Sequence, residues 1–198
     1  MEIFWNTIAR YNAATWPWQI AIVAAAAVLT VLLYLRPTQN VKRAMKLFLA
    51  GLNAWIAVVY YLVWCGQRSH SDVLALFWGI MAVIWLYDLY ADFTRFERTS
   101  RPNGFALLLY LMPLAYPLFS LARGLSFPMM TMPVMPCSVA VFTIGLMLAF
   151  THRINIFLVL FLCHWALIGL AKVYFFGIPE DFLLAASTCL LYTSDAAD

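Results

Sequence analysis

The chain has 198 residues, of which 65% are hydrophobic and only 11% are charged, and its mean hydropathy is +0.86. Soluble globular domains are about 45–50% apolar and about 25% charged, so the composition excludes an ordinary soluble enzyme and a disordered chain. Twelve Lys and Arg residues, a net charge of +3 and no basic run also exclude nucleic-acid binding as the main function. The sequence therefore predicts an all-α, polytopic bundle of transmembrane helices.

Six apolar stretches are long enough to cross a bilayer, which takes about 20 residues in a helix. In chain order we expect these spans at residues 17–35, 45–64, 73–91, 105–121, 132–150 and 154–176. A truncated seventh helix is expected to begin at Pro179. Before the first span, residues 2–15 mix Ile, Phe and Trp with polar residues, which predicts a short helix lying in the membrane interface, with a frayed terminus as the alternative.

The last ten residues, 189–198, read CLLYTSDAAD, and their back-translation resembles a common transposase-type sequencing adapter read in frame. We therefore expect residues 1–188 to form a single integral membrane domain and residues 189–198 to be a translated adapter scar, which is not native. No internal repeat and no linker long enough to separate two domains is visible in the sequence.

Basic residues in the connections predict the orientation, because cytoplasmic loops of membrane proteins are enriched in Lys and Arg. The connections after the first, third and fifth spans carry eight of the twelve basic residues, and the opposite side carries four. This asymmetry predicts a multi-pass protein of the cell inner membrane with its N-terminus outside. The eight are Arg36, Lys42, Arg43, Lys46, Arg95, Arg98, Arg101 and Arg153.

Three polar residues inside the predicted spans are functional candidates, because polar and ionisable groups are costly in hydrocarbon. Asp88 shares a helix face with Asp92; we favour a carboxylate paired with Arg95 or a neighbouring arginine over a proton carrier. His164 could relay protons, but a hydrogen bond to a backbone carbonyl or a hydroxyl is the simpler interpretation. Asn53 is expected to join two helices by a hydrogen bond.

Sulfur-containing side chains are concentrated before the fifth span, where residues 127–137 read FPMMTMPVMPC. Soft sulfur ligands bind Cu(I), yet an apolar, methionine-rich loop is the simpler interpretation, so we assign no metal and leave any cofactor unknown. Cys65 and Cys137 are both expected near the outer face, where an oxidising compartment would permit a disulfide if their geometry allowed it. Residues 177–181, GIPED, favour a helix start over a catalytic carboxylate pair.

Several stretches together carry a resemblance to a known family. They are Tyr11-Asn12 with Trp16-Pro17, Val59-Tyr60, Tyr116-Pro117, Pro136-Cys137, residues 142–145 (FTIG), Trp165 with Gly169, and residues 177–181. Over almost its whole length the chain resembles the uncharacterised bacterial membrane proteins of domain-of-unknown-function family 6064. The resemblance implies about seven spans but no activity, cofactor or partner. This chain departs from the family in having Ser138 where proline is common, and neither the methionine cluster nor His164 is a family feature.

Eight polar, aromatic or thiol residues, scattered over the sequence, fall near the outer face in the predicted topology. Polar and aromatic groups that converge in a concavity are typical of a binding site. We therefore predict a small transporter or ligand-binding membrane protein with an outward-facing pocket. The predicted pocket residues are Tyr11, Asn12, Trp16, Tyr60, Tyr116, Cys137, Glu180 and Asp181.

Two other functions stay open on the sequence alone. One is a membrane-embedded enzyme or redox factor that uses Cys137 with Glu180 and Asp181. The other is a structural membrane subunit whose outer face docks a partner. The lipid bilayer is the partner that the sequence predicts; nucleic acid is not expected, and a small-molecule or protein partner is unknown.

Overall fold

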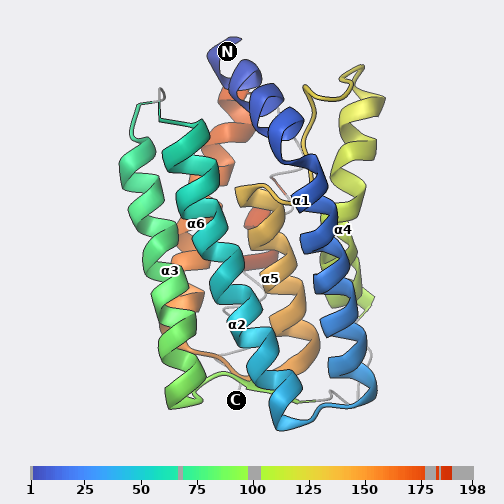
Figure 1. The fold of residues 1–198 in the computed structure, drawn as a ribbon, viewed down its shortest axis with the longest axis vertical. Coiled ribbons are helices and arrows are strands. Elements are labelled where there is room, and N and C mark those ends of the chain that lie inside the picture. The colour runs from blue at the N-terminus through green and yellow to red at the C-terminus, as the bar shows by residue number, and fades with distance from the viewer. Residues whose placement is uncertain (1, 67–68, 98–103, 177–181, 183, 189–198) are drawn as a thin grey trace.

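The computed structural model describes residues 2–66, 69–97, 104–176, 182 and 184–188 (Figure 1). Its elements in chain order are α1 (Glu2–Leu35), α2 (Gln39–Trp55), the π-helix η1 (Ile56–Trp64), α3 (Ser71–Ala91), β1 (Arg95–Phe96), α4 (Gly104–Ala122), α5 (Pro136–Phe150), β2 (Thr151–Arg153) and α6 (Ile156–Phe176). The π-helix continues α2 without a break, and β1 pairs with β2 in a short antiparallel ladder. The predicted all-α fold class is confirmed.

Five described helical segments are long and apolar enough to cross a membrane: α1, α2 together with η1, α3, α4 and α6. The predicted count of six complete spans is not reproduced, because α5 has only 15 residues. Residues 132–135 belong to the preceding connection, and Pro136 starts the helix, where a missing N–H costs nothing. The predicted start of a seventh helix at Pro179 lies outside the described residues, whereas residues 184–188 are helical.

The separate interfacial helix predicted for residues 2–15 is wrong, because α1 is one helix of 34 residues. Pro17 lies inside α1, and the turns before it are inclined to the rest of the helix in Figure 1. Ile8, Asn12, Thr15 and Gln19 repeat at helical spacing and are buried, so the N-terminal turns pack on the bundle.

The helices alternate in direction, which gives the bundle two chemically different ends. The end that carries the N-terminus also holds the turn after η1 and the connection 123–135 (Figure 1). We call it the N-terminal end. The turn between α1 and α2 lies at the opposite end with β1 and β2, and we call that the strand end.

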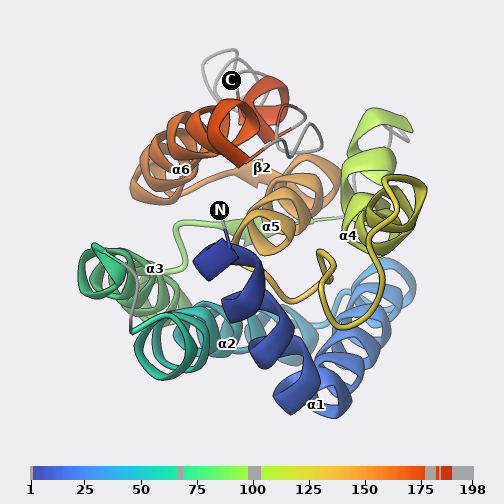
Figure 2. The same cartoon turned by 90° about the horizontal axis from the view of Figure 1, so that it is seen from above.

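Helix α5 is the centre of the bundle, and Figure 2 shows it between α1, α4 and α6. Every residue from Pro136 to Met147 is buried. Helix α4 approaches α5 closely at Gly145, where an added Cβ would lie 2.5 Å from the backbone nitrogen of Tyr110. Small residues permit this kind of close helix contact in membranes, where packing rather than the hydrophobic effect joins helices.

Candidate functional site

At the N-terminal end, the connection 123–135 folds back against the inner side of α1 (Figure 2). The side-chain amide of Asn12 donates hydrogen bonds of 2.8 Å to the carbonyl oxygens of Pro128 and Met130. The Tyr11 hydroxyl donates to the carbonyl oxygen of Val134 over 2.7 Å. Non-helical backbone inside an apolar bundle needs such partners, because unsatisfied buried carbonyls are costly.

Neighbouring side chains hold Tyr11 and Asn12 in place. The indole N–H of Trp55 donates to the Tyr11 hydroxyl over 3.1 Å, and the ring of Tyr60 meets that of Tyr11 edge to face with centroids 4.9 Å apart. The Gln19 amide donates to Asn12 Oδ1 over 3.3 Å, while Gln19 Oε1 has no hydrogen-bond partner among the described residues. Tyr11 therefore both donates and accepts, which fixes its hydroxyl.

The same connection is bound on its other side by α4 and α5. The Thr131 and Ser120 hydroxyls are 2.5 Å apart, and Thr131 Oγ1 donates to the carbonyl oxygen of Tyr116 over 3.2 Å. Ser138, in the first turn of α5, donates to the carbonyl oxygen of Met132 over 3.0 Å. Together with Tyr11 and Asn12, these bonds make the connection 123–135 a packed cover, which we call the loop closure.

The structure describes six of the eight predicted pocket residues. Five of them are buried around the loop closure, namely Tyr11, Asn12, Tyr60, Tyr116 and Cys137. Trp16 is 47% exposed, and Glu180 and Asp181 lie outside the described residues. Tyr11 and Asn12 bind the connection through their side chains, whereas Tyr116 accepts the Thr131 hydroxyl through its backbone carbonyl.

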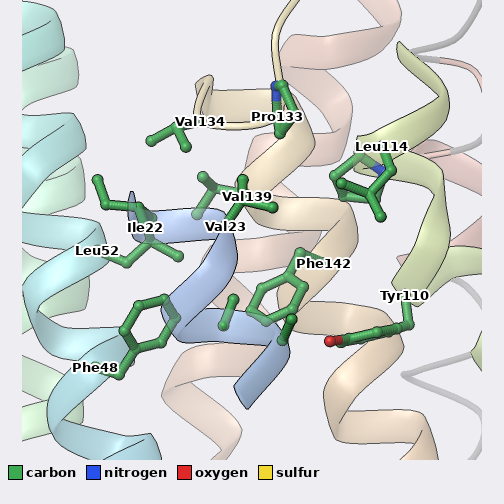
Figure 3. A pocket seen from close by; sticks show the side chains of 13 residues that line it. Ile22, Val23, Phe48, Leu52, Tyr110, Leu114, Pro133, Val134, Val139 and Phe142 are labelled. Atoms are coloured by element: carbon green, nitrogen blue, oxygen red, sulfur yellow. The ribbon is translucent and has the colours of Figure 1, made fainter. Parts of the chain in front are cut away.

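An apolar cleft of about 70 Å³ begins directly beneath the loop closure (Figure 3). Its walls come from α1, α2, α4, α5 and the loop closure. The lining residues are Ile22, Val23, Ala26, Ala27, Phe48, Leu52, Tyr110, Pro133, Leu114, Pro113, Val134, Val139 and Phe142. Tyr110 contributes a polar group to this lining, namely its hydroxyl, which is hydrogen-bonded to Thr30. Sequence reasoning missed the cleft because its residues do not differ in type from those that face lipid or core.

At the strand end, the Lys46 side chain is 2% exposed, and its ammonium makes two hydrogen bonds and two ion-pair contacts within the protein. It lies 3.0 Å from Asp88 Oδ2 and 2.7 Å from Asp92 Oδ1, and it donates to the backbone carbonyl of Asp88 over 3.1 Å. We call these three residues the ion cluster. The sequence analysis counted Lys46 among the loop charges. The available signal was its position two turns inside α2, together with two acids four residues apart at the end of α3, Asp88 and Asp92.

The acids of the ion cluster also organise the chain after α3. Asp92 has φ of 53°, a left-handed conformation that Asp tolerates, and it ends α3. Asp88 Oδ1 accepts the Thr94 backbone N–H over 2.9 Å, and the Thr94 hydroxyl accepts the Asn155 backbone N–H over 3.1 Å. The ion cluster is therefore connected to the strand end of α6.

A polar cavity of about 160 Å³ reaches the ion cluster from the strand end. Its lining includes Lys42, Lys46, Asp92, Arg95 and Glu97. The hydrogen bond from Lys46 holds the pKa of Asp92 below its ordinary value, with smaller contributions from the charges of Lys46, Arg95 and Lys42 against an opposing desolvation. Asp92 is 48% exposed, so it links the buried lysine to solvent.

The three intramembrane candidates differ in their surroundings from our expectations. Asp88 pairs with Lys46 and not with an arginine, because α2 brings the lysine nearer than any described loop residue. Asn53 donates to the Leu49 carbonyl of its own helix over 2.7 Å, so it does not join two helices; the i−4 carbonyl lies within its reach. His164 is exposed, with its ring centroid 5.6 Å from that of Phe77.

The sulfur-containing residues are part of the packing of the loop closure. Met130 and Met135 are each 6% exposed, and the Met135 sulfur accepts the Met132 backbone N–H over 3.1 Å. Cys65 and Cys137 are both buried thiols that no disulfide joins. Among the described residues, no group of three His, Cys, Asp or Glu side chains is placed to hold a metal ion.

Comparison with known proteins gives one match. The model of a family of unknown function, DUF6064, matches residues 1–194. The chain belongs to this family. The match extends into residues 189–194, so it does not separate the predicted adapter scar from the rest of the family sequence. No curated protein and no solved structure matches the chain.

Proposed function

We propose that this DUF6064 protein binds an apolar or amphipathic small molecule inside the membrane and acts as a small transporter. The observation that carries the proposal is an apolar cleft between α1, α2, α4 and α5, with the loop closure at one end. Val134, whose carbonyl binds Tyr11, lines the cleft near the loop closure. Phe48, two residues after Lys46, lines it toward the strand end. Figure 3 places Val134 and Phe48 at opposite ends of the cleft.

The lining defines the chemistry of the ligand. Twelve of the thirteen lining residues are apolar, and the Tyr110 hydroxyl is already bonded to Thr30. Affinity would therefore come from buried apolar surface, at roughly 25 cal/mol for each Å². The volume of about 70 Å³ is smaller than the roughly 150 Å³ of an engineered cavity that holds benzene, so the cleft has room for a short segment of an alkyl chain rather than a ring.

The basic residues give the direction. The strand end carries Arg36, Lys42, Arg43, Arg95 and Arg153, so we place it in the cytoplasm and the N-terminal end outside the inner membrane. Movement of the loop closure would then open the cleft outward. The enzyme alternative has less support, because Cys137 is 9% exposed and its proposed acidic partners lie outside the described residues.

The first test is photolabelling of the protein in liposomes with a diazirine-bearing hexadecanol, followed by mass spectrometry of the labelled peptides. Val139 and Phe142 on α5 are buried from lipid, so their labelling requires the probe to enter the cleft. Ala26→Phe fills the cleft and should abolish labelling of α5. Ala25→Phe, on the neighbouring exposed position, should leave it unchanged. Unlabelled α5 in the natural chain would refute binding.

Transport needs a second measurement. A Val139→Cys variant, in a background without other cysteines, would be treated with a membrane-impermeant maleimide from each side of the membrane in turn. Labelling from both sides, reduced by hexadecanol, is the result expected of a transporter. Labelling from one side only would restrict the function to ligand binding.

A further inference from the structure

The outer surface of α2 and α3 carries a second concave feature near the strand end, away from the cleft. It is an open groove of about 420 Å³. Its lining residues are Arg43, Ala44, Leu47, Leu86, Leu89 and Tyr90. We call it the lipid-facing groove. The α2 residues that line it, Arg43, Ala44 and Leu47, neither line the cleft nor belong to the ion cluster. The groove therefore does not depend on the proposed function.

The groove is polar at one end and apolar at the other. Arg43 precedes Leu47 by four residues on α2, and Leu86 precedes Tyr90 by four on α3, so each pair shares a helix face. Helix α2 runs away from the strand end and α3 returns to it, so Arg43 lies nearer that end than Leu47, and Tyr90 lies nearer it than Leu86. Tyr90 is 92% exposed, a position typical of aromatic residues at a membrane interface.

Among the residues that the structure describes, none forms a salt bridge with Arg43. Among the described residues, the salt bridges are those of Lys46 with Asp88 and Asp92, and no residue that lines the groove is acidic. Arg43 is exposed at the basic end of the bundle. A guanidinium can bind a phosphate through two parallel hydrogen bonds, which makes arginine well suited to phosphate recognition.

We propose that the lipid-facing groove binds one anionic phospholipid. Its phosphate is held by the Arg43 guanidinium with the Tyr90 hydroxyl, and one acyl chain lies along Leu47 and Leu86. Basic pockets between transmembrane helices on the cytoplasmic side are suited to anionic headgroups. The pair of Lys46 with Asp88 joins α2 to α3 one turn deeper, and so aligns the two walls of the groove.

The test uses the full chain, delipidated in detergent and titrated with phosphatidylglycerol or phosphatidylcholine while bound lipid is counted by native mass spectrometry. We expect one tightly retained phosphatidylglycerol and weaker, graded binding of phosphatidylcholine. Arg43→Gln should weaken phosphatidylglycerol binding about five- to tenfold, since one cation near an anionic headgroup is lost. Tyr90→Phe should weaken it about twofold, through loss of one neutral hydrogen bond.

The matched control is Lys42→Gln, which removes the same charge from the adjacent residue, whose side chain lines the polar cavity instead. It should leave phosphatidylglycerol binding unchanged. Equal loss in Lys42→Gln and Arg43→Gln would show a diffuse charge effect and overturn the site. Equal retention of the two lipids would also overturn the site. Displacement of bound phosphatidylglycerol by millimolar inorganic phosphate or glycerol phosphate would overturn it as well, because the acyl chain would then contribute nothing to binding. Thermal melting of both variants verifies that each is folded.

Discussion

The two ends of the bundle are closed by different chemistry. At the N-terminal end, neutral side chains of α1 bind backbone carbonyls of the loop closure. At the strand end, one buried ammonium is shared by two carboxylates. A neutral hydrogen bond contributes only about 0.5–1.5 kcal/mol, whereas removal of one partner from a buried ion pair costs about 3–5 kcal/mol. Removal of one partner is therefore expected to cost more at the strand end than at the loop closure.

Gly145→Ala in α5 should destabilise both ends of the bundle together. Its new Cβ would lie 2.5 Å from the Tyr110 nitrogen and 2.9 Å from the Leu109 carbonyl carbon, so the backbones of α4 and α5 must separate. A side chain that meets an added methyl group can turn away, but here the obstacles are backbone atoms of α4, so the contact between α4 and α5 must open. We expect the largest fall in melting temperature of any variant discussed, measured in detergent by differential scanning fluorimetry.

Gly79→Ala is the matched control, because nothing lies within 4 Å of a Cβ added to Gly79 on α3. It should be neutral or slightly stabilising, as alanine favours a helix over glycine. If the two variants melt alike, α5 does not depend on a close contact at Gly145, and the two ends are not coupled through it.

The next largest effect is expected from Lys46→Met at the strand end. The change leaves Asp88, which is 0% exposed, without its cation and should destabilise the protein by about 3–5 kcal/mol. The double variant Lys46→Met/Asp88→Asn should recover most of this loss, since asparagine is neutral and still accepts the Thr94 N–H. Thermal melting of the single and double variants measures the difference.

Lys42→Met removes a neighbouring charge that lies outside the ion cluster, and it should change the melting temperature little. A double variant as unstable as Lys46→Met would contradict the importance of charge balance. The loss would then come from packing of the lysine stem.

At the N-terminal end, Asn12→Ala removes two hydrogen bonds and leaves the carbonyls of Pro128 and Met130 without them. The expected loss is about 1–3 kcal/mol, and it should be local. Hydrogen–deuterium exchange should rise in residues 125–135 and stay unchanged near Lys46. Asn6→Ala, at an exposed position of the same helix, provides the control. Equal exchange at both ends would show that the two closures open together.

The sequence predicted the helical class, the apolar segments and the convergence of Tyr11, Asn12 and Tyr60 on one end. These features follow from local composition and from alternation of helix direction, both of which are readable in one chain. Lys46, the partner of Asp88, was missed because it lies close to a loop in the sequence and was counted among the solvent-exposed loop charges. Side-chain placement depends on how α2 and α3 pack, which no local pattern reports.

The lengths of α1 and α5 were also mispredicted, for one shared reason. Hydropathy does not separate apolar helix from apolar loop, so residues 132–135 were included in a span. Nor does it separate a helix in the interface from one packed on a bundle, since both need a face like that of Ile8 and Tyr11. The apolar cleft is a property of tertiary packing, and its residues give no signal in the sequence.

The smallest effect distinguishes the two acids of the ion cluster by their response to pH. Lys46 holds the pKa of folded Asp92 below the ordinary value, so ionised Asp92 stabilises the fold above that value. The stabilisation is lost as the pH falls through the lowered pKa, which predicts a decrease of melting temperature below about pH 4. Because Asp92 is 48% exposed, solvent screens the effect and it should be small.

Melting curves between pH 6 and pH 3 compare the natural chain with Asp92→Asn, whose acid-induced loss should be shallower. Asp72→Asn removes the same charge at the other end of α3, and it should keep the slope of the natural chain. If Asp92→Asn keeps that slope too, Asp88 alone balances the charge of Lys46. The strand end would then be closed by a single buried ion pair, which is not linked to solvent through Asp92.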